Sequence, residues 1–147
     1  MNISPIRNIN NNDFNKYYLY LLNQLSPINF RNFSKLKFNE FIKNLSNKHQ
    51  IYVIEDSDKN KIIGTITIII ESKIIHIFGK VCHIEDLVID KGYQNLKLGT
   101  KLINFAIEKG KEEKCYKVIL NCSNEYKNYY IKKGFYNSGN QMRKDII

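Results

Sequence analysis

Two adjacent carboxylates and a polar loop are the first features of this chain that could do chemistry. Glu85 and Asp86 interrupt the apolar run 81–89, which predicts a strand. The loop at 94–101 follows and leads into a helix-patterned segment. The first N–H groups of a helix are unpaired and its dipole is positive there, so this loop suits a phosphate group.

Three tyrosines on the segment 124–133 form the second feature. Tyr126, Tyr129 and Tyr130 stand at i, i+3 and i+4, so they share one face of a predicted helix. A tyrosine hydroxyl is a workable general acid, although tyrosines at this spacing also serve for packing. Each feature taken alone has an ordinary structural explanation, and their joint occurrence in this order favours a function.

The elements that must position these residues follow an α/β pattern. If the strands 81–89 and 115–122 pair in parallel, as in a βαβ unit, both end at the edge of the sheet beside the loop. We expect one α/β (α+β) domain over residues 1–147, with a mixed, mostly antiparallel sheet and flanking helices. The predicted elements are a helix that Asp13 caps and Ser26-Pro27 ends, a helix with Phe38, Phe41, Ile42 and Leu45 on one face, strands at 51–54, 62–71, 74–78 and 81–89, a helix at 98–109 that Gly110 ends, a strand at 115–122, a helix at 124–133, and closing strands at 135–136 and 141–146.

Composition limits the class of protein and its partners. The 147 residues carry a net charge of +9, which admits nucleic acid, acidic lipid or phosphorylated small molecules. Arginine, the residue best suited to bidentate phosphate or base contacts, is scarce, which disfavours nucleic acid. We expect no membrane span or signal peptide, because no apolar run reaches ~18 residues and no charged-then-apolar leader opens the chain. Three cysteines without a C-x-x-C pair predict reduced thiols in a soluble, cytoplasmic protein, with no metal.

The order of these motifs resembles the GNAT superfamily of N-acetyltransferases. More narrowly, it is similar to the glucosamine 6-phosphate N-acetyltransferases of hexosamine synthesis. The similarity covers roughly residues 62 to 145, and it is looser in the first 50 residues. The motifs that carry it are Gln24-Leu25-Ser26, Lys73-Ile74-Ile75-His76, Cys82 to Ile89, Tyr93-Gln94, Leu98 to Leu102, Cys115-Tyr116-Lys117 and Tyr129 to Phe135.

The resemblance implies transfer of an acetyl group from acetyl-CoA to the 2-amino group of glucosamine 6-phosphate, without a covalent enzyme intermediate. Tyr130 would protonate the departing thiolate. Glu85 and Asp86 would bind the sugar and orient its amine, with base catalysis as a second role. The residues implied for CoA are Leu87, Val88, Ile89, Gln94, Asn95, Leu96, Lys97, Leu98, Gly99, Thr100, Lys101 and Tyr130.

The same resemblance implies a homodimer in which the partner subunit completes the sugar site. Arg143 or Lys144 would come from that partner, while Lys80, Lys117 and Ser26 would meet the 6-phosphate. The residues implied for the sugar are Ser26, Lys73, Ile74, Ile75, His76, Lys80, Glu85, Asp86, Tyr116, Lys117, Asn121, Arg143 and Lys144.

Three positions depart from the family pattern. Lys97 replaces a glycine of the loop, Asn121 replaces the usual carboxylate, and Tyr126 replaces a frequent asparagine. Two alternative functions remain open at this point. One is an acetyltransferase of the same fold that acts on a polyamine or a protein N-terminus. The other is a non-catalytic basic domain that binds nucleic acid or CoA.

Overall fold

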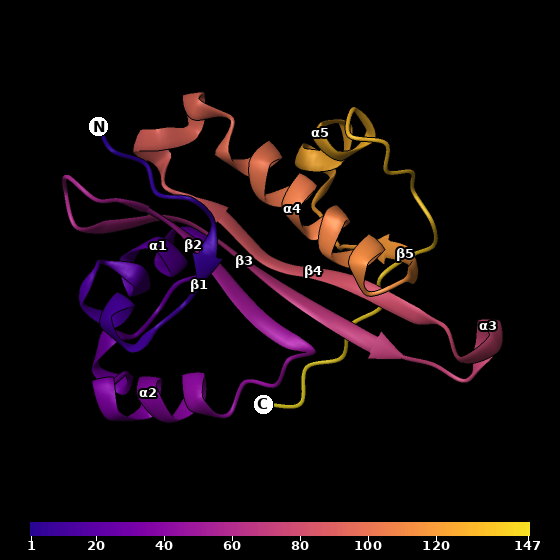
Figure 1. Ribbon diagram of the computed structural model, residues 1–147, viewed down its shortest axis with the longest axis horizontal. Coiled ribbons are helices and arrows are strands. Elements are labelled where there is room, and N and C mark those ends of the chain that lie inside the picture. The colour runs from indigo at the N-terminus through magenta and orange to yellow at the C-terminus, as the bar shows by residue number, and fades with distance from the viewer.

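The β-branched run at 61–72 forms the middle strand of a five-stranded sheet in the computed structural model, which describes residues 1–147 (Figure 1). Six of its twelve residues are isoleucine, and the strand is buried from Ile62 to Ile68. The strand order in the sheet follows the chain order. The strands are β1 (Arg7–Asn8), β2 (His49–Asp56), β3 (Lys61–Ser72), β4 (Lys80–Ile89) and β5 (Cys115–Ile119).

The sheet is mixed and mostly antiparallel, as predicted. β1 to β4 pair as antiparallel neighbours, and β4 pairs in parallel with β5. The α helix between β4 and β5 makes these two strands a βαβ unit. The predicted fold class is therefore confirmed, including the parallel pair that brings two strand ends to one edge.

Helices cover both faces of the sheet, and each face has its own hydrophobic cluster (Figure 1). One cluster joins the long helix α4 to the sheet through buried Leu102, Ala106 and Ile66. The other joins α1 to the opposite face through Leu21 and Val53. The helices are α1 (Tyr18–Leu25), α2 (Lys35–Lys43), α3 (Ile75–Phe78), α4 (Leu98–Glu112) and α5 (Lys127–Ile131), with 3-10 turns η1 (Asn11–Asn15), η2 (Phe30–Asn32), η3 (Lys91–Leu96) and η4 (Asn124–Tyr126).

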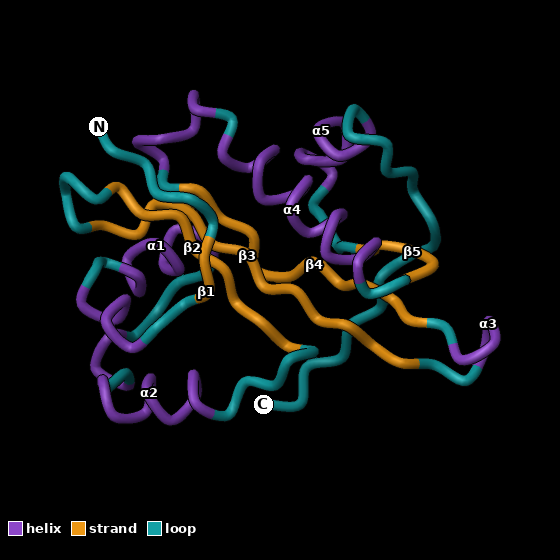
Figure 2. Tube along the Cα trace, viewed as in Figure 1, coloured by secondary structure: helices purple, strands orange, loops and turns teal.

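The strand predicted at 74–78 is wrong. Ser72 of β3 pairs directly with Lys80 of β4, so the segment between them is the end of a long hairpin that projects beyond the sheet (Figure 2). Three residues in a row, His76 to Phe78, have positive φ near 57°, and the four-residue turn α3 forms instead. The segment has no neighbouring strand to pair with, so its β-branched residues alone cannot make it a strand.

The first helix also begins later than predicted. Asn10, not Asp13, caps the 3-10 turn η1, and Tyr17 takes left-handed φ before α1 begins at Tyr18. The Asp13 carboxylate is fully buried, and two hydrogen bonds from the Arg7 guanidinium, at 2.9 and 2.8 Å, compensate for the loss of water. This ion pair joins β1 to η1. The Asp13 side chain, which was expected to cap a continuous helix, is therefore bound to Arg7.

Three boundaries in the last third of the chain differ from the prediction. Gly110 lies inside α4, which continues to Glu112, and β5 ends at Ile119 rather than at Cys122. The predicted closing strands at 135–136 and 141–146 do not form, and this stretch is a loop throughout (Figure 2). No helix of the structure combines the length and apolar character needed to cross a bilayer.

Candidate active site

The site begins where β4 and β5 separate. Their parallel pairing runs only as far as His83 opposite Ile119, but β4 continues to Ile89. A pocket of about 820 Å³ opens between the diverging strands. Its lining residues are Gln24, Leu25, Ser26, Ile84, Glu85, Asp86, Leu87, Val88, Ile89, Lys91, Gln94, Lys97, Gly99, Thr100, Leu120, Asn121, Cys122, Ser123, Tyr126, Tyr129 and Tyr130.

A β-bulge in β4 shapes the floor of this pocket. Glu85 lies opposite Thr67 and Val88 lies opposite Thr65, so two residues, Asp86 and Leu87, face one on β3. Asp86 has φ of 47°, a left-handed conformation that aspartate tolerates better than most residues. The bulge interrupts the strict alternation of the strand, and Glu85 and Asp86 both line the pocket.

The loop after β4 forms the opposite wall. Asp90 caps η3 by accepting a hydrogen bond from Gly92 N at 2.9 Å, and Lys97 with φ of 55° turns the chain into α4. Lys97 and Gly99 line the pocket at the start of this 15-residue helix. Backbone N–H groups at a helix start, together with a lysine, provide donors for an anionic phosphate.

Burial and hydrogen bonding have opposite effects on the pKa of the Asp90 carboxylate, which holds this loop. Burial alone would favour the neutral acid, but the Lys61 ammonium at 2.9 Å, the Gly92 N–H and the Gln24 amide outweigh it. The pKa of Asp90 is therefore lowered, and the side chain is charged at neutral pH.

Gly99 makes a close contact that a larger residue would disturb. A Cβ at this position would lie 2.7 Å from Tyr129 Oη, well inside van der Waals contact. The Lys133 ammonium lies 3.5 Å from the centroid of the Tyr129 ring on α5. The glycine and this tyrosine therefore join α4 and α5 at the mouth of the pocket.

Tyr130 is the pocket residue with the most altered acidity. Burial raises its pKa to about 12, and the neighbouring Tyr129, Cys122 and Tyr126 add to the effect. Its ring packs edge-on against Tyr129 at 5.2 Å and Phe135 at 5.9 Å. The hydroxyl is therefore protonated at neutral pH, on a residue that lines the pocket.

The structure brings only part of the predicted coenzyme residues to the pocket. Asn95, Leu96, Leu98 and Lys101 do not line it, and Leu98 is buried in the core instead. The predicted coenzyme residues that do line the pocket are Leu87, Val88, Ile89, Gln94, Lys97, Gly99, Thr100 and Tyr130.

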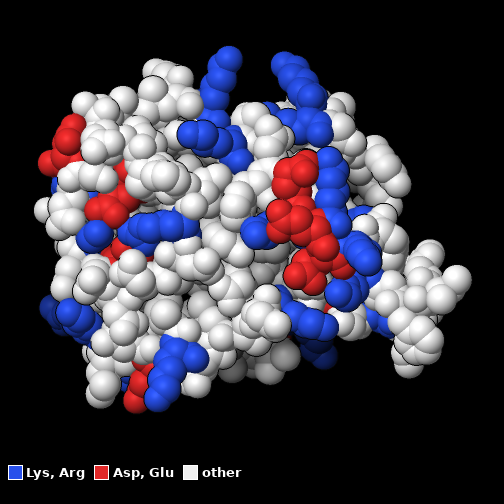
Figure 3. Space-filling model, viewed as in Figure 1, with Lys and Arg blue, Asp and Glu red and all other residues white.

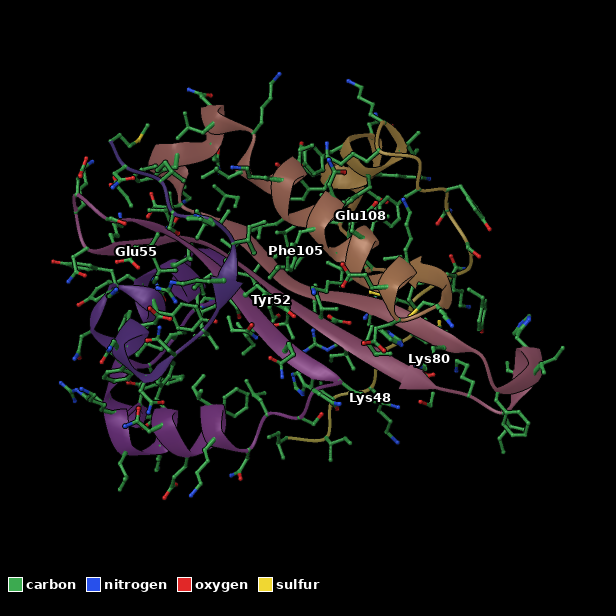
Figure 4. The ribbon with its side chains drawn as sticks, viewed as in Figure 1. Lys48, Tyr52, Glu55, Lys80, Phe105 and Glu108 are labelled. Atoms are coloured by element: carbon green, nitrogen blue, oxygen red, sulfur yellow. The ribbon has the colours of Figure 1, made fainter.

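The predicted sugar residues divide into two groups. Ser26, Glu85, Asp86 and Asn121 line the pocket, and the others do not. Lys80 stands at the far end of β4, beside the projecting hairpin (Figure 4). Glu85 is five residue steps further along the strand, or roughly 17 Å. The predicted residues outside the pocket are Lys73, Ile74, Ile75, His76, Lys80, Tyr116, Lys117, Arg143 and Lys144.

The far group has its own contacts. The rings of His76 and Tyr116 lie 4.2 Å apart, and the Lys117 ammonium lies 5.5 Å from the Tyr116 ring. Lys80 is 3.4 Å from Glu113, while Arg143 pairs with Asp145 at 2.6 Å in the C-terminal loop. Within one chain, these basic residues therefore do not reach the pocket.

Sequence reasoning assigned no site role to several pocket residues. The pocket residues Leu120, Cys122 and Ser123 follow the end of β5. The sequence predicts that β4 and β5 are parallel and end at the same edge of the sheet, and this prediction could have indicated them. Gln24 lies 66 residues before Asp90 in the chain, and no local pattern indicates that the two meet.

No group of three or more His, Cys, Asp or Glu residues is arranged to hold a metal ion.

Charge on the outer surface is mixed rather than uniformly basic. Acidic side chains gather over α4, among lysines, on the face shown in Figure 3. Glu108, labelled in Figure 4, pairs with Lys111 at 2.7 Å, and Glu112 pairs with Lys109 at 3.0 Å. This face offers no continuous basic surface to a nucleic acid.

Comparison with known proteins gives a consistent result. The model of the acetyltransferase (GNAT) family matches residues 12–135. A glucosamine 6-phosphate N-acetyltransferase of Arabidopsis thaliana is 37% identical over 95% of this chain and 94% of its own, and one of Candida albicans is 34% identical over 88% and 87%. The crystal structure of the Arabidopsis thaliana enzyme superposes with a TM-score of 0.93 at 33% identity, covering all of both chains. The chain belongs to the GNAT family of acetyltransferases.

Proposed function

We propose that this chain transfers the acetyl group of acetyl-CoA to the 2-amino group of glucosamine 6-phosphate. The products are N-acetylglucosamine 6-phosphate and CoA. The observation that carries the proposal is the pocket between β4 and β5, which joins an acidic pair, a helix start and a protonated tyrosine. The relatives named as glucosamine 6-phosphate N-acetyltransferases support the choice of acceptor.

Acetyl-CoA would bind along the outer wall of the pocket. Beyond His83 the backbone of β4 has no β5 partner, so residues 87–89 offer a free strand edge to the peptide-like pantetheine arm. A backbone N–H on this edge would stabilise negative charge on the thioester oxygen. The pyrophosphate would lie at the backbone N–H groups and the lysine at the start of α4, where Lys97 and Gly99 line the pocket.

The transfer would proceed by direct attack of the sugar amine on the thioester carbon. Glu85 and Asp86 would orient the amine, and one of them would take its proton directly or through water. The carbon–sulfur bond breaks as the carbon–nitrogen bond forms, and the Tyr130 hydroxyl donates its proton to the departing thiolate.

The cysteines do not suit a covalent route. Burial raises the pKa of Cys82 to about 11, and its thiol donates to Ala106 O at 3.7 Å inside the core. Cys122 lines the pocket, but no histidine lines the pocket beside it. This arrangement favours transfer without an acetylated cysteine.

We further propose that two copies of the chain share the sugar site. Ile74, Ile75, Ile77 and Phe78 are 62–94% exposed on the hairpin end, an apolar surface that a monomer would rarely leave open. A second copy packed on this surface would bring its own Lys80, Lys117 and C-terminal basic residues toward the pocket of the first. These cations would then meet the 6-phosphate.

A thiol-release assay tests the proposed acceptor against its alternatives. Acetyl-CoA is offered with glucosamine 6-phosphate, spermidine or a basic peptide, and product mass identifies the acetylated molecule. We expect release only with the sugar phosphate, because the Lys80 and Lys117 cations would repel a polycation. Release with spermidine or the peptide alone would instead support another amine acceptor, and no release at all would support a binding domain.

A further inference from the structure

A buried carboxylate marks the junction between β4 and the pocket loop. The Asp90 side chain is only 8% exposed. Its Oδ2 accepts from Lys61 Nζ at 2.9 Å and from Gln24 Nε2 at 3.1 Å, while its Oδ1 accepts from Gly92 N. Its backbone N–H donates to Ile63 O at 2.8 Å. This junction is therefore fixed to the sheet on one side and to α1 on the other.

Gln24 of α1 uses both ends of its side-chain amide at this junction. Nε2 donates to the Asp90 carboxylate, and Oε1 accepts from the backbone N–H of Lys91 at 3.0 Å. These partners determine the orientation of the amide. In the reverse orientation Oε1 would face the Asp90 carboxylate, another acceptor, and Nε2 would face the Lys91 N–H, another donor. These are the only side-chain hydrogen bonds between α1 and the loop 90–97.

The position of Gln24 joins the two halves of the pocket. Its immediate neighbours Leu25 and Ser26 line the pocket, and Ser26 is proposed for the sugar phosphate. The loop that Gln24 holds leads to Lys97 and Gly99, which are proposed for CoA. A shift of the loop would therefore break hydrogen bonds to α1, and a shift of the end of α1 would release the loop.

We propose that Gln24 is a positioning residue that couples coenzyme binding to acceptor binding. The inference rests on the proposed placement of CoA at the loop 94–100. CoA bound there fixes the loop, the loop fixes Gln24, and Gln24 fixes the end of α1 for the sugar phosphate. Linkage requires the reverse effect to be equal in size.

Calorimetric titration of CoA, with and without saturating glucosamine 6-phosphate, measures this coupling. CoA carries no acetyl group, so the ternary complex does not react. For the wild-type chain we expect the sugar phosphate to tighten CoA binding by about 5-fold or more, within the usual range of coupling. We call this ratio of the two Kd values the coupling factor. In Gln24→Met, which keeps the length but loses both hydrogen bonds, the coupling factor should fall to about 1 and the Kd for CoA should rise.

Two further variants separate coupling from stability. Gln50→Met removes hydrogen bonds that another glutamine makes on β2, outside the pocket, and should retain the wild-type factor. Gln24→Glu keeps the side-chain shape but places a second carboxylate against Asp90, and should lose the factor as Gln24→Met does. A factor of 1 in the wild type, or a wild-type factor in both folded Gln24 variants, overturns the proposal.

The Gly99→Val variant distinguishes a failure of this inference from a failure of the CoA placement. Its side chain would fill the space beside Tyr129 Oη. If Gly99→Val binds CoA as tightly as the wild type, CoA does not lie at this loop. The proposed CoA placement and the proposed role of Gln24 are then both overturned. If it loses CoA affinity while Gln24→Met keeps the wild-type factor, the CoA site stands and only the role of Gln24 is overturned.

Discussion

At the scale of single residues, the account depends most on Tyr130. Its hydroxyl is half-buried and has a pKa raised to about 12 by burial and by its tyrosine and cysteine neighbours. The phenol is therefore protonated at neutral pH, and the proposed acid role rests on its place in the pocket, because a higher pKa makes a tyrosine a weaker proton donor.

Tyr130→Phe should lower kcat by roughly 10- to 1,000-fold, because the thiolate must then leave without a positioned acid. The pH profile of wild-type kcat should show no descending limb from this group below about pH 11. Stopped assays of CoA release at saturating substrates measure both quantities. Tyr17→Phe, on an exposed tyrosine outside the pocket, is the control. An unchanged kcat in Tyr130→Phe would remove its role as an acid.

Gly99 and Tyr129 form a contact that a double-mutant cycle can test. Gly99→Ala should raise the KM for acetyl-CoA by roughly 3- to 10-fold, because the new Cβ displaces the Tyr129 hydroxyl. Tyr129→Phe in the same chain should restore most of the loss, since the nearest ring atom, Cζ, is 3.8 Å away. Equal KM values in the single and double variants would show that the contact does not shape the coenzyme site.

At the scale of elements, α4 must approach the sheet closely to hold the pocket wall. Gly110 was expected to end α4, but it lies inside this helix. Val118 of β5 and Cys82 of β4 pack directly against it. A Cβ there would be 3.2 Å from Val118 Cγ2 and 3.3 Å from Cys82 Cβ. The glycine therefore serves helix–sheet packing and not termination.

Gly110→Leu should destabilise the chain by about 1–3 kcal/mol or more, although leucine is the better helix former. Urea unfolding followed by circular dichroism measures the change. Lys111→Leu, at the next and exposed position of α4, is the matched control and should be close to neutral. Gly110→Leu with wild-type stability would mean that the helix does not pack this tightly.

The sequence predicted most of these elements, because hydrophobic periodicity is strong where one face of an element is buried. It predicted the parallel strands at 81–89 and 115–122 and the loop between β4 and α4. It failed at 74–78, where an apolar, β-branched stretch projects from the sheet and has no strand to pair with. It failed at Asp13 because an ion pair with Arg7 was invisible in the local pattern.

The candidate site was predictable for the same reason and within the same limit. Glu85, Asp86 and Gly99 belong to one continuous stretch of the chain, from β4 to the start of α4, so local motifs found them. Gln24 and Cys122 reach the pocket from distant elements, and only the three-dimensional structure places them there. The implied phosphate ligands Lys80 and Lys117 match family motifs but lie outside the pocket of their own chain.

At the scale of the whole molecule, the exposed hairpin end is the feature that a single chain leaves unexplained. Ile77 and Phe78 are 94% and 77% exposed, and the C-terminal stretch that was expected to form strands is a loop. Both facts support a second copy as the missing neighbour.

Phe78→Glu should convert the protein to a monomer in light-scattering chromatography. Activity with glucosamine 6-phosphate should fall by roughly 10-fold or more, while the Kd for CoA stays unchanged, because only the sugar site needs the second copy. Leu36→Glu, on an equally exposed apolar residue of α2, should remain dimeric and active. A monomeric wild type with full activity would contradict the shared site.

The central claim is that the pocket acetylates a phosphorylated aminosugar. Steady-state kinetics with glucosamine 6-phosphate and with glucosamine, at one saturating concentration of acetyl-CoA, test it most directly. We predict that kcat/KM is about 100-fold or more higher for the phosphate, because a charge-assisted contact to an anionic phosphate is lost with glucosamine. Equal kcat/KM for the two sugars would contradict the claim.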